Sequence, residues 1–404
     1  MGESKLKITL LDNTPFLSED GVTYDLKRAE DYCGKIAGIC YNKKGLRASL
    51  AEKDESTQRR IEGTMDNGHH SVYEHANIGL YLEGESKALN MILNNEGFYA
   101  TSERSLRYTE VRRDTCNLTE KEINLYEKWL RYFMQLLSAE YTKRNEPMTK
   151  KTMDGITKLA QENARYMVSV FINTEMAHTV SLAQLNKVVG MMKEFLEKDN
   201  KDEFQERLAD DFDQFIKECE KLNVLDDRLQ TNRDHRILRM FGENLSELPE
   251  EFGNTYSTVY PGSFAMYAQS QRHRIEWQKF ERNPENGFYV PRLLTDLYPD
   301  LVPEWQKDIE SVKAEIPQGE LISIYEDGNI DKLISRAQRR CCTHAQLEIF
   351  DQTMALIQRY YEALKEKDHP LAKKLLPYVG KRACMFPNGS CTNPCGRAKE
   401  ERYW

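Results

Sequence analysis

Three long stretches with apolar residues at helical spacing constrain the fold of this chain more than any other feature. They cover Glu120–Lys143, residues 154–198 and a segment near the C-terminus. Steps of three and four residues place apolar side chains on one helix face, which must then pack against another element. We expect long helices, the middle one broken near 169–173 and after His178. The C-terminal stripe consists of Phe350, Met354, Ile357, Tyr361 and Leu364.

Shorter segments between these stretches are typical of strands. Residues 7–11, 76–82 and 256–265 are apolar or partly alternating. Residues 200–222 are charged and amphipathic, which predicts a solvated helix. Helices therefore dominate, with short strands between them, and the predicted fold class is α+β.

The length of the chain favours two units. Its 404 residues are about two to three times a typical domain, and 40% of them are hydrophobic, which is enough for a sizeable core. Residues 223–244 are the candidate seam, although no Pro/Gly/Ser-rich linker marks it.

Composition also limits the surroundings and partners. No apolar run approaches the roughly 20 residues that span a bilayer, and residues 1–14 lack the apolar core of a signal peptide. Nine cysteines, an odd number, are typical of reduced thiols. A net charge of −8 argues against binding nucleic acid over the whole surface, although a local basic pocket stays compatible with it. We expect a cytoplasmic protein without a membrane or a nucleic acid polymer as partner.

The histidine-rich segment at 69–75 is a weak metal candidate. His69, His70 and His75 lack helical ligand spacing, so hydrogen bonding is the favoured interpretation. The motifs G-x-S-x-G, G-x-G-x-x-G, G-x-x-x-x-G-K-[ST] and H-E-x-x-H do not occur, which removes several common nucleophile, phosphate-loop and zinc sites.

Cys384, Cys391 and Cys395 are a better metal candidate, because three thiols in a Pro/Gly-rich segment could supply most of a tetrahedral zinc shell. Their spacing lacks a C-x-x-C pair, and free thiols in a C-terminal tail explain them equally well. We therefore assign no metal.

Two cationic and polar segments suit an anionic ligand. Ser105 and Arg107 alternate along the chain, so in an extended segment both would face one anionic group, and a hydroxyl beside a guanidinium suits phosphate. Residues 269–274 read Gln-Ser-Gln-Arg-His-Arg, with three adjacent cationic or potentially cationic side chains. Solvated surface runs are the alternative for both segments.

The first half of the chain resembles the flavin-dependent thymidylate synthases. The marker of that family reads RHR, seven residues, then S-x-R-Y, and an H-x-S-x-x-E-H segment lies upstream of it. Here residues 69–75 match the upstream segment, and residues 105–108 match the end of the marker. Glu103 also matches, whereas Asn95-Glu96-Gly97 stands where RHR belongs. Further on, Glu162, Ala164, Arg165 and Thr174 match.

The second half shows the reverse. Arg272-His273-Arg274 is present with Gln269 three residues before it, but Arg282 replaces the expected serine. Arg340, His344, Gln346 and Glu348 resemble the late R-x-x-x-H-A-Q-x-E segment of the family, and Asn329 also matches. Functional arginines of the family are replaced by Ala183, Met192 and Asp331.

The resemblance implies a tandem duplication with copies at 1–230 and 231–404, each a helix-rich domain with a small, mostly antiparallel sheet. Family members are homotetramers whose sites lie between subunits, so each homotetramer chain must keep every element. After fusion, one composite site needs each element only once. We therefore expect a composite site built from both copies, and a homodimer that resembles the tetramer. Random decay into an inactive scaffold is the alternative.

The resemblance also implies an activity, the reductive methylation of dUMP to dTMP. Methylenetetrahydrofolate would supply the carbon, and FAD reduced by NADPH would supply the hydride. Arg340 would stabilise negative charge on the uracil ring, with Ser105 as the second catalytic candidate. The alternatives are modification of another pyrimidine nucleotide, for example by hydroxymethylation, and a catalytically silent nucleotide- or flavin-binding protein. The expected nucleotide contacts are Glu103, Ser105, Arg107, Arg165, Gln269 and Arg272. The expected flavin contacts are His69, Ser71, Glu103, Arg272, His273, Arg274 and Asn329.

Overall fold

The computed structural model describes residues 6–40, 42–114, 116–231, 236–273 and 277–387, together with residues 389, 391, 395 and 402. It divides into two compact units, and each unit takes two separate segments of the chain. Unit 1 comprises Met1–Arg104 and Phe171–Arg239, and unit 2 comprises Ser105–Val170 and Met240–Trp404.

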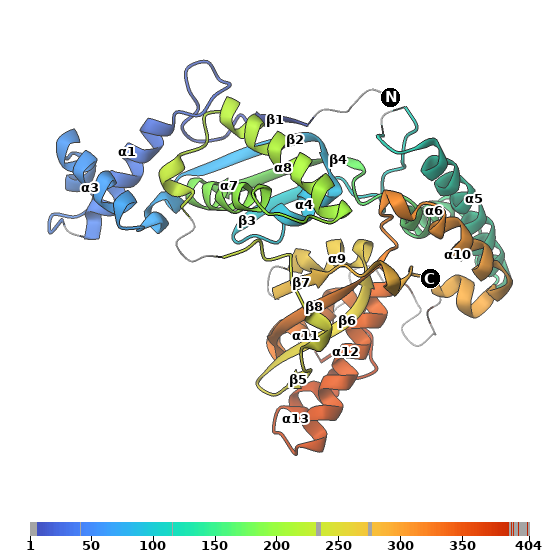
Figure 1. Ribbon diagram of the computed structural model, residues 1–404. Coiled ribbons are helices and arrows are strands. Elements are labelled where there is room, and N and C mark those ends of the chain that lie inside the picture. The colour runs from blue at the N-terminus through green and yellow to red at the C-terminus, as the bar shows by residue number, and fades with distance from the viewer. Residues whose placement is uncertain are drawn as a thin grey trace. The chain divides into compact units, whose positions relative to one another are not determined.

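Unit 1 is built on an antiparallel sheet with the strand order β1-β2-β4-β3. Helices α4, α7 and α8 pack against this sheet (Figure 1). The strands are β1 (Lys7–Leu10), β2 (Asn77–Ser86), β3 (Tyr99–Glu103) and β4 (Asn173–Ser181). The helices are α1 (Leu26–Ala37), α2 (Leu46–Leu50), α3 (Asp54–Asp66), α4 (Lys87–Leu93), α7 (Leu182–Leu196) and α8 (Glu203–Lys221).

Unit 2 is built on a second antiparallel sheet, with the order β5-β6-β8-β7. Helices α9, α11 and α12 form the layer beside it (Figure 1). The strands are β5 (Glu251–Phe252), β6 (Thr255–Ser263), β7 (Trp277–Glu281) and β8 (Leu321–Asn329). The helices are α5 (Glu120–Lys143), α6 (Lys150–Ala164), α9 (Phe264–Ser270), α10 (Val302–Glu310), α11 (Ile330–Arg340), α12 (Leu347–Glu366) and α13 (Ala372–Leu375).

These elements confirm the α+β fold class and most of the predicted elements. Helix α5 has the predicted bounds, and α8 and α12 lie where the apolar patterns place helices. Helix α8 is not simply solvated, because Phe204, Leu208 and Phe212 on one face are buried. The break predicted inside 154–198 holds a strand, β4, which the sequence analysis missed. Among the described residues, no helix combines the length and apolar character that crossing a bilayer requires.

The two sheets share the same strand-to-helix junctions. Four strands run directly into a helix, and the last residue of each strand caps that helix by accepting a backbone N–H with its side chain. The four capping residues are Ser86, Ser181, Ser263 and Asn329. This repeated order of strands, helices and caps supports the tandem duplication, which stays a prediction.

The compact units do not follow the predicted copies 1–230 and 231–404. Helices α5 and α6 pack within unit 2, because the Trp129 ring lies 4.9 Å from the Trp305 ring. The indole nitrogen of Trp129 also donates to Asp308 at 2.9 Å. Burial of these aromatic side chains anchors the helical hairpin to α10.

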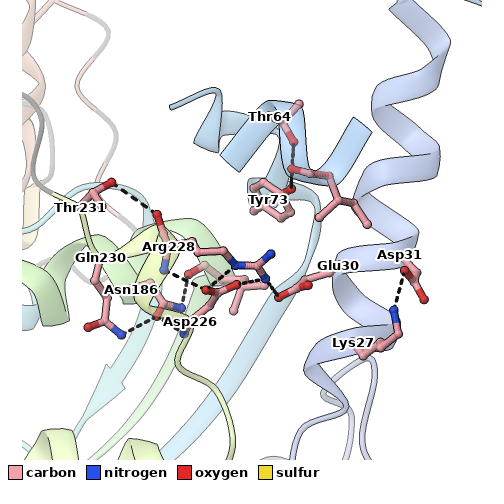
Figure 2. Close-up of polar contacts among 12 residues, drawn as sticks. Lys27, Glu30, Asp31, Thr64, Tyr73, Asn186, Asp226, Arg228, Gln230 and Thr231 are labelled. Atoms are coloured by element: carbon pink, nitrogen blue, oxygen red, sulfur yellow. Dashed lines mark hydrogen bonds and ion pairs between the residues drawn. The ribbon is translucent and has the colours of Figure 1, made fainter. Parts of the chain in front are cut away.

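A carboxylate pair in unit 1 links α1 to the segment after α8 (Figure 2). Arg228 donates to Glu30 at 2.8 Å and to Asp226 at 2.6 and 3.0 Å. The backbone N–H of Asp226 donates to the Asn186 side chain on α7 at 2.8 Å. Burial, and after it a hydrogen bond with Asp226, raise the pKa of Glu30 to about 7 against the opposing effect of Arg228.

Because the pKa of Glu30 is raised in the fold, we expect the free energy of unfolding of unit 1 to fall as the pH rises. The pKa of Glu30 is higher in the folded than in the unfolded chain, so its contribution is complete below about pH 4.5 and is lost as the pH passes about 7. The full effect is about 3 kcal/mol at most. Urea unfolding between pH 4.5 and 7.5 should show this fall, and Glu30→Gln should flatten it.

Asp31→Asn is the control for this prediction, because Asp31 lies on the same helix and makes an exposed ion pair with Lys27 (Figure 2). It should leave the slope of the unfolding free energy against pH unchanged. An equal slope in wild type and Glu30→Gln would contradict the assignment to Glu30.

Candidate active site

Ser105 and Arg107 begin unit 2 in a turn. The backbone N–H groups of Tyr108 and Thr109 donate to the Ser105 carbonyl at 2.9 and 3.0 Å, and Arg107 N–H donates to Ser105 Oγ at 3.3 Å. The predicted extended segment is therefore wrong, because serine hydroxyls favour such local turns. The turn still holds the Ser105 hydroxyl close to the Arg107 backbone.

The Arg107 guanidinium is held by two groups of unit 2. Its Nε forms an ion pair with Glu162 on α6, and its Nη2 donates to the His344 carbonyl at 2.9 Å. Most of both charged side chains is buried. The segment after β3 is thereby fixed to the segment before α12.

Gln269, near the end of α9, lies at the centre of the cluster. With its amide in the orientation that satisfies its neighbours, its side-chain oxygen accepts from Arg107 Nη1 and Arg340 Nη1, each at 3.0 Å. Its side-chain nitrogen donates to Gln346 Oε1 at 2.9 Å. Arg340 Nη2 also donates to the Gln269 backbone carbonyl at 3.0 Å. Two arginines from distant parts of the chain thus meet at one amide.

Arg165 reaches the same cluster from the end of α6. It is buried, and its Nη2 donates to Gln346 Oε1 at 2.6 Å. Among the described residues, its Nε has no hydrogen-bond partner although it is buried. A buried guanidinium donor of this kind is costly unless an acceptor meets it.

The electrostatics of this arginine cluster favour an anion. Burial and the charges of Arg336, Arg107 and Arg272 lower the pKa of Arg340 to about 10. Burial also lowers the pKa of Arg165. Arg340 stays protonated at neutral pH, so an anionic ligand beside it would offset its repulsion by the neighbouring arginines.

Unit 1 contains another part of the predicted site, a pocket of about 280 Å³ beside the start of α7. His69 and Ser71, both predicted flavin contacts, line this pocket. Ala183, which replaces an expected arginine, lines it too, and Lys187 lies one helical turn further along α7. The remaining lining residues are Gly68, His70, Glu74, Gln184, Leu229 and Thr231.

Two other residues predicted to contact the ligands make ion pairs or hydrogen bonds within the protein. Glu103 pairs with Lys87 at 2.5 Å, and the Asn329 side chain caps α11 by accepting from Lys332 N–H at 3.0 Å. Arg272 is half-buried just after α9. The side chain of His273 and the whole of Arg274 lie outside the described residues.

Three further residues of the cluster were missed or given no role in the sequence analysis. Gln346 and Glu348 appeared there only as parts of a family motif, and Tyr166 did not appear. The Tyr166 hydroxyl donates to Glu348 at 2.8 Å, and Gln346 contacts both residues. Proximity in sequence to Arg165 was the one available signal for Tyr166.

The C-terminal thiols form no metal centre among the described residues, where no group of three or more Cys, His, Asp or Glu side chains is arranged for an ion. Cys384, Cys391 and Cys395 are exposed.

Part of the chain matches a known protein family. The family described as thymidylate synthase complementing protein matches residues 22–219. The flavin-dependent thymidylate synthase of Thermococcus onnurineus (strain NA1) is 25% identical over 152 residues, which are 35% of this chain and 56% of that relative. The chain therefore spans about half the length of this curated relative.

Two solved structures are also similar to parts of the chain. One is a UMP/dUMP methylase, PolB, from Streptomyces cacaoi bound with 5-Br dUMP, with 14% identity, a TM-score of 0.35, and coverage of 56% of this chain and 94% of the other. The second is thymidylate synthase X from Helicobacter pylori with FAD and dUMP, with 16% identity, a TM-score of 0.29, and coverage of 56% and 100%. At TM-scores below 0.5, neither likeness supports an argument about this chain.

Proposed function

We propose that this chain is a flavin-dependent enzyme that methylates dUMP to dTMP, and the match of residues 22–219 to the thymidylate synthase complementing protein family supports this proposal. One observation carries the proposal: Arg107 and Arg340 converge on Gln269, while Arg165 meets Gln346, which Gln269 also contacts. These groups come from both halves of the sequence, as a composite site requires.

The arginine cluster suits a pyrimidine nucleotide. Guanidinium groups bind phosphate through paired N–H donors, and Arg107 beside the Ser105 hydroxyl is placed for this role. The side-chain nitrogen of Gln269 has two N–H groups, of which Gln346 accepts one, so the other could donate to a carbonyl of uracil. The buried Arg165 Nε would find its acceptor on the same ligand.

Arg340 is the group we assign to the reacting ring. A half-buried guanidinium that remains charged stabilises negative charge on a bound uracil more than an exposed one, because water screens it less. That stabilisation would make C5 of the ring nucleophilic. Gln269 holds Arg340 through two contacts and so fixes the direction of the charge.

The residues of unit 1 fit part of a flavin. The pocket offers hydroxyl, imidazole, amide and ammonium groups from Ser71, His69, Gln184 and Lys187, but its volume of about 280 Å³ lies below the roughly 300–1,000 Å³ of typical ligand pockets. It would therefore hold one part of FAD. When bound, FAD supplies the hydride chemistry, with NADPH as reductant and methylenetetrahydrofolate as carbon donor.

A spectral titration tests the proposed function. Purified protein loaded with FAD should show a visible flavin spectrum that shifts saturably as dUMP is added, because flavin and nucleotide lie close together in such an enzyme. Flavin binding with a response to UMP or dCMP but none to dUMP would instead support modification of another pyrimidine nucleotide. Protein that binds no flavin would overturn the proposal.

A silent nucleotide-binding protein is the second candidate, and the residue at position 331 favours it. Asp331 stands where the family has a flavin-contacting arginine, and it makes an ion pair with Lys374 at 2.5 Å. A carboxylate there offers no positive charge to a flavin phosphate. Saturable binding of dUMP by protein that binds no FAD would favour this candidate.

A further inference from the structure

Glu348 is a buried carboxylate in the first turn of α12, and it accepts hydrogen bonds from three parts of unit 2. Ser263 donates its backbone N–H at 2.8 Å and its hydroxyl at 2.6 Å. The Tyr166 hydroxyl donates at 2.8 Å, and Gln346 Nε2 donates at 3.2 Å. Glu348 thereby joins the start of α9, the end of α6 and the segment that precedes α12.

One of the groups that Glu348 holds, the Gln346 amide, contacts a site arginine. Gln346 accepts from Arg165 with the oxygen of the same amide whose nitrogen donates to Glu348. That oxygen also accepts from Gln269, which in turn accepts from Arg107 and Arg340. A chain of two amides therefore leads from one carboxylate to three guanidinium groups.

We propose that Glu348 is a positioning residue that sets the orientation of the Gln346 amide, and through it the placement of Arg165, in the anion site of unit 2. The identity of that anion rests on the proposed function. The series of hydrogen bonds from Glu348 to the arginines does not depend on that function.

The contacts require acceptors on both oxygens of Glu348. Oε1 faces the backbone N–H of Ser263, and Oε2 faces the side-chain nitrogen of Gln346. An amide in place of the carboxylate would set its own N–H group against one of these donors in either orientation. Glu348→Gln should therefore disturb Gln346 although it preserves the size of the side chain.

Unit 1 offers a matched control. Ser86 caps α4 as Ser263 caps α9, and its hydroxyl donates to Asp211 Oδ2 on α8 at 2.5 Å. Burial raises the pKa of Asp211 to about 6, against the opposing effects of Ser86 and Arg207. Asp211→Asn thus alters a similar but only partly buried serine–carboxylate contact in the unit that lacks Arg165 and Gln346.

Arginine labelling with a dicarbonyl reagent, read by peptide mass spectrometry, tests the proposal without any nucleotide. Arg165 should react about tenfold faster in Glu348→Gln than in wild type, since loss of one buried hydrogen-bonding partner commonly shifts a local equilibrium by that factor. Arg336, which is buried in an ion pair with Glu326, should stay slow and serves as the internal reference. Asp211→Asn should leave Arg165 slow.

Two results would overturn the proposal: unchanged Arg165 labelling in folded Glu348→Gln, or equal acceleration in Asp211→Asn. If Glu348→Gln does not fold, Ser263→Ala replaces it, because that variant removes a hydroxyl that donates to Glu348 Oε2 and leaves the contact between Tyr166 and Gln346 in place, and it should also accelerate Arg165 labelling. The affinity for dUMP, measured by calorimetry, should fall about tenfold in parallel. Wild-type protein that binds no dUMP would refute the proposed function, while the labelling would still decide the role of Glu348.

Discussion

Replacement of Arg340 by alanine should reduce turnover of dUMP by about 100- to 1,000-fold, the usual cost of removing a preorganised group that stabilises charge in the transition state. The fold should survive, because Arg340 is the last residue of α11 and is only half-buried. Steady-state kinetics together with thermal unfolding would measure both effects.

Arg339→Ala is the matched control for that variant. Arg339 is the preceding residue of α11, has the same charge and is exposed. It should keep turnover within about twofold of wild type, because exposed charges are screened. Arg340→Lys should fall between wild type and alanine, since an ammonium group keeps the charge but cannot make both contacts to Gln269. Full activity in Arg340→Ala would remove Arg340 from the mechanism.

Local patterns made much of the fold predictable. Helix α5 could be placed because its apolar stripe is long, and a capping box of Thr119 and Glu122 marks its start. Strand β4 was missed because Glu175, Met176 and Ala177 favour helices in isolation. Its alternating burial arises only from pairing with β2 on one side and β3 on the other. Such contacts are distant in sequence, so no local pattern reports them.

The candidate site was predictable where a residue carries a distinctive chemistry. Arg107, Arg340 and Gln269 were chosen from their residue types and from the family resemblance, and unit 2 brings them together. The Tyr166–Glu348 contact was not foreseen, because tyrosine and glutamate are common and 182 positions separate them. The turn at Ser105 was also missed. Alternation in sequence does not reveal that the Ser105 hydroxyl accepts a hydrogen bond from the backbone N–H of Arg107, two residues later.

Mixing two inactive variants should restore almost no activity. Arg107 precedes the candidate seam and Arg340 follows it, yet both donate to the Gln269 side chain within unit 2 of one chain. If the protein is the homodimer that the family resemblance implies, a dimer of one Arg107→Ala chain and one Arg340→Ala chain contains two defective sites. Activity of the mixture should therefore stay at the level of the separate variants.

Closure of the site across chains would instead restore a calculable fraction of wild-type activity. If the two arginines met across chains, half of the dimers in an equal mixture would be mixed, and each would hold one intact site, giving about 25% of wild-type activity. Differently tagged chains, co-expressed and purified through both tags, would raise the mixed fraction, and native mass spectrometry would verify it. Recovery of that size in verified mixed dimers would contradict closure within one chain. If the verified mixed dimers are no more active than the separate variants, Arg107 and Arg340 act on the nucleotide from a single chain. The second copy in the chain would then supply what a neighbouring subunit supplies in a homotetramer.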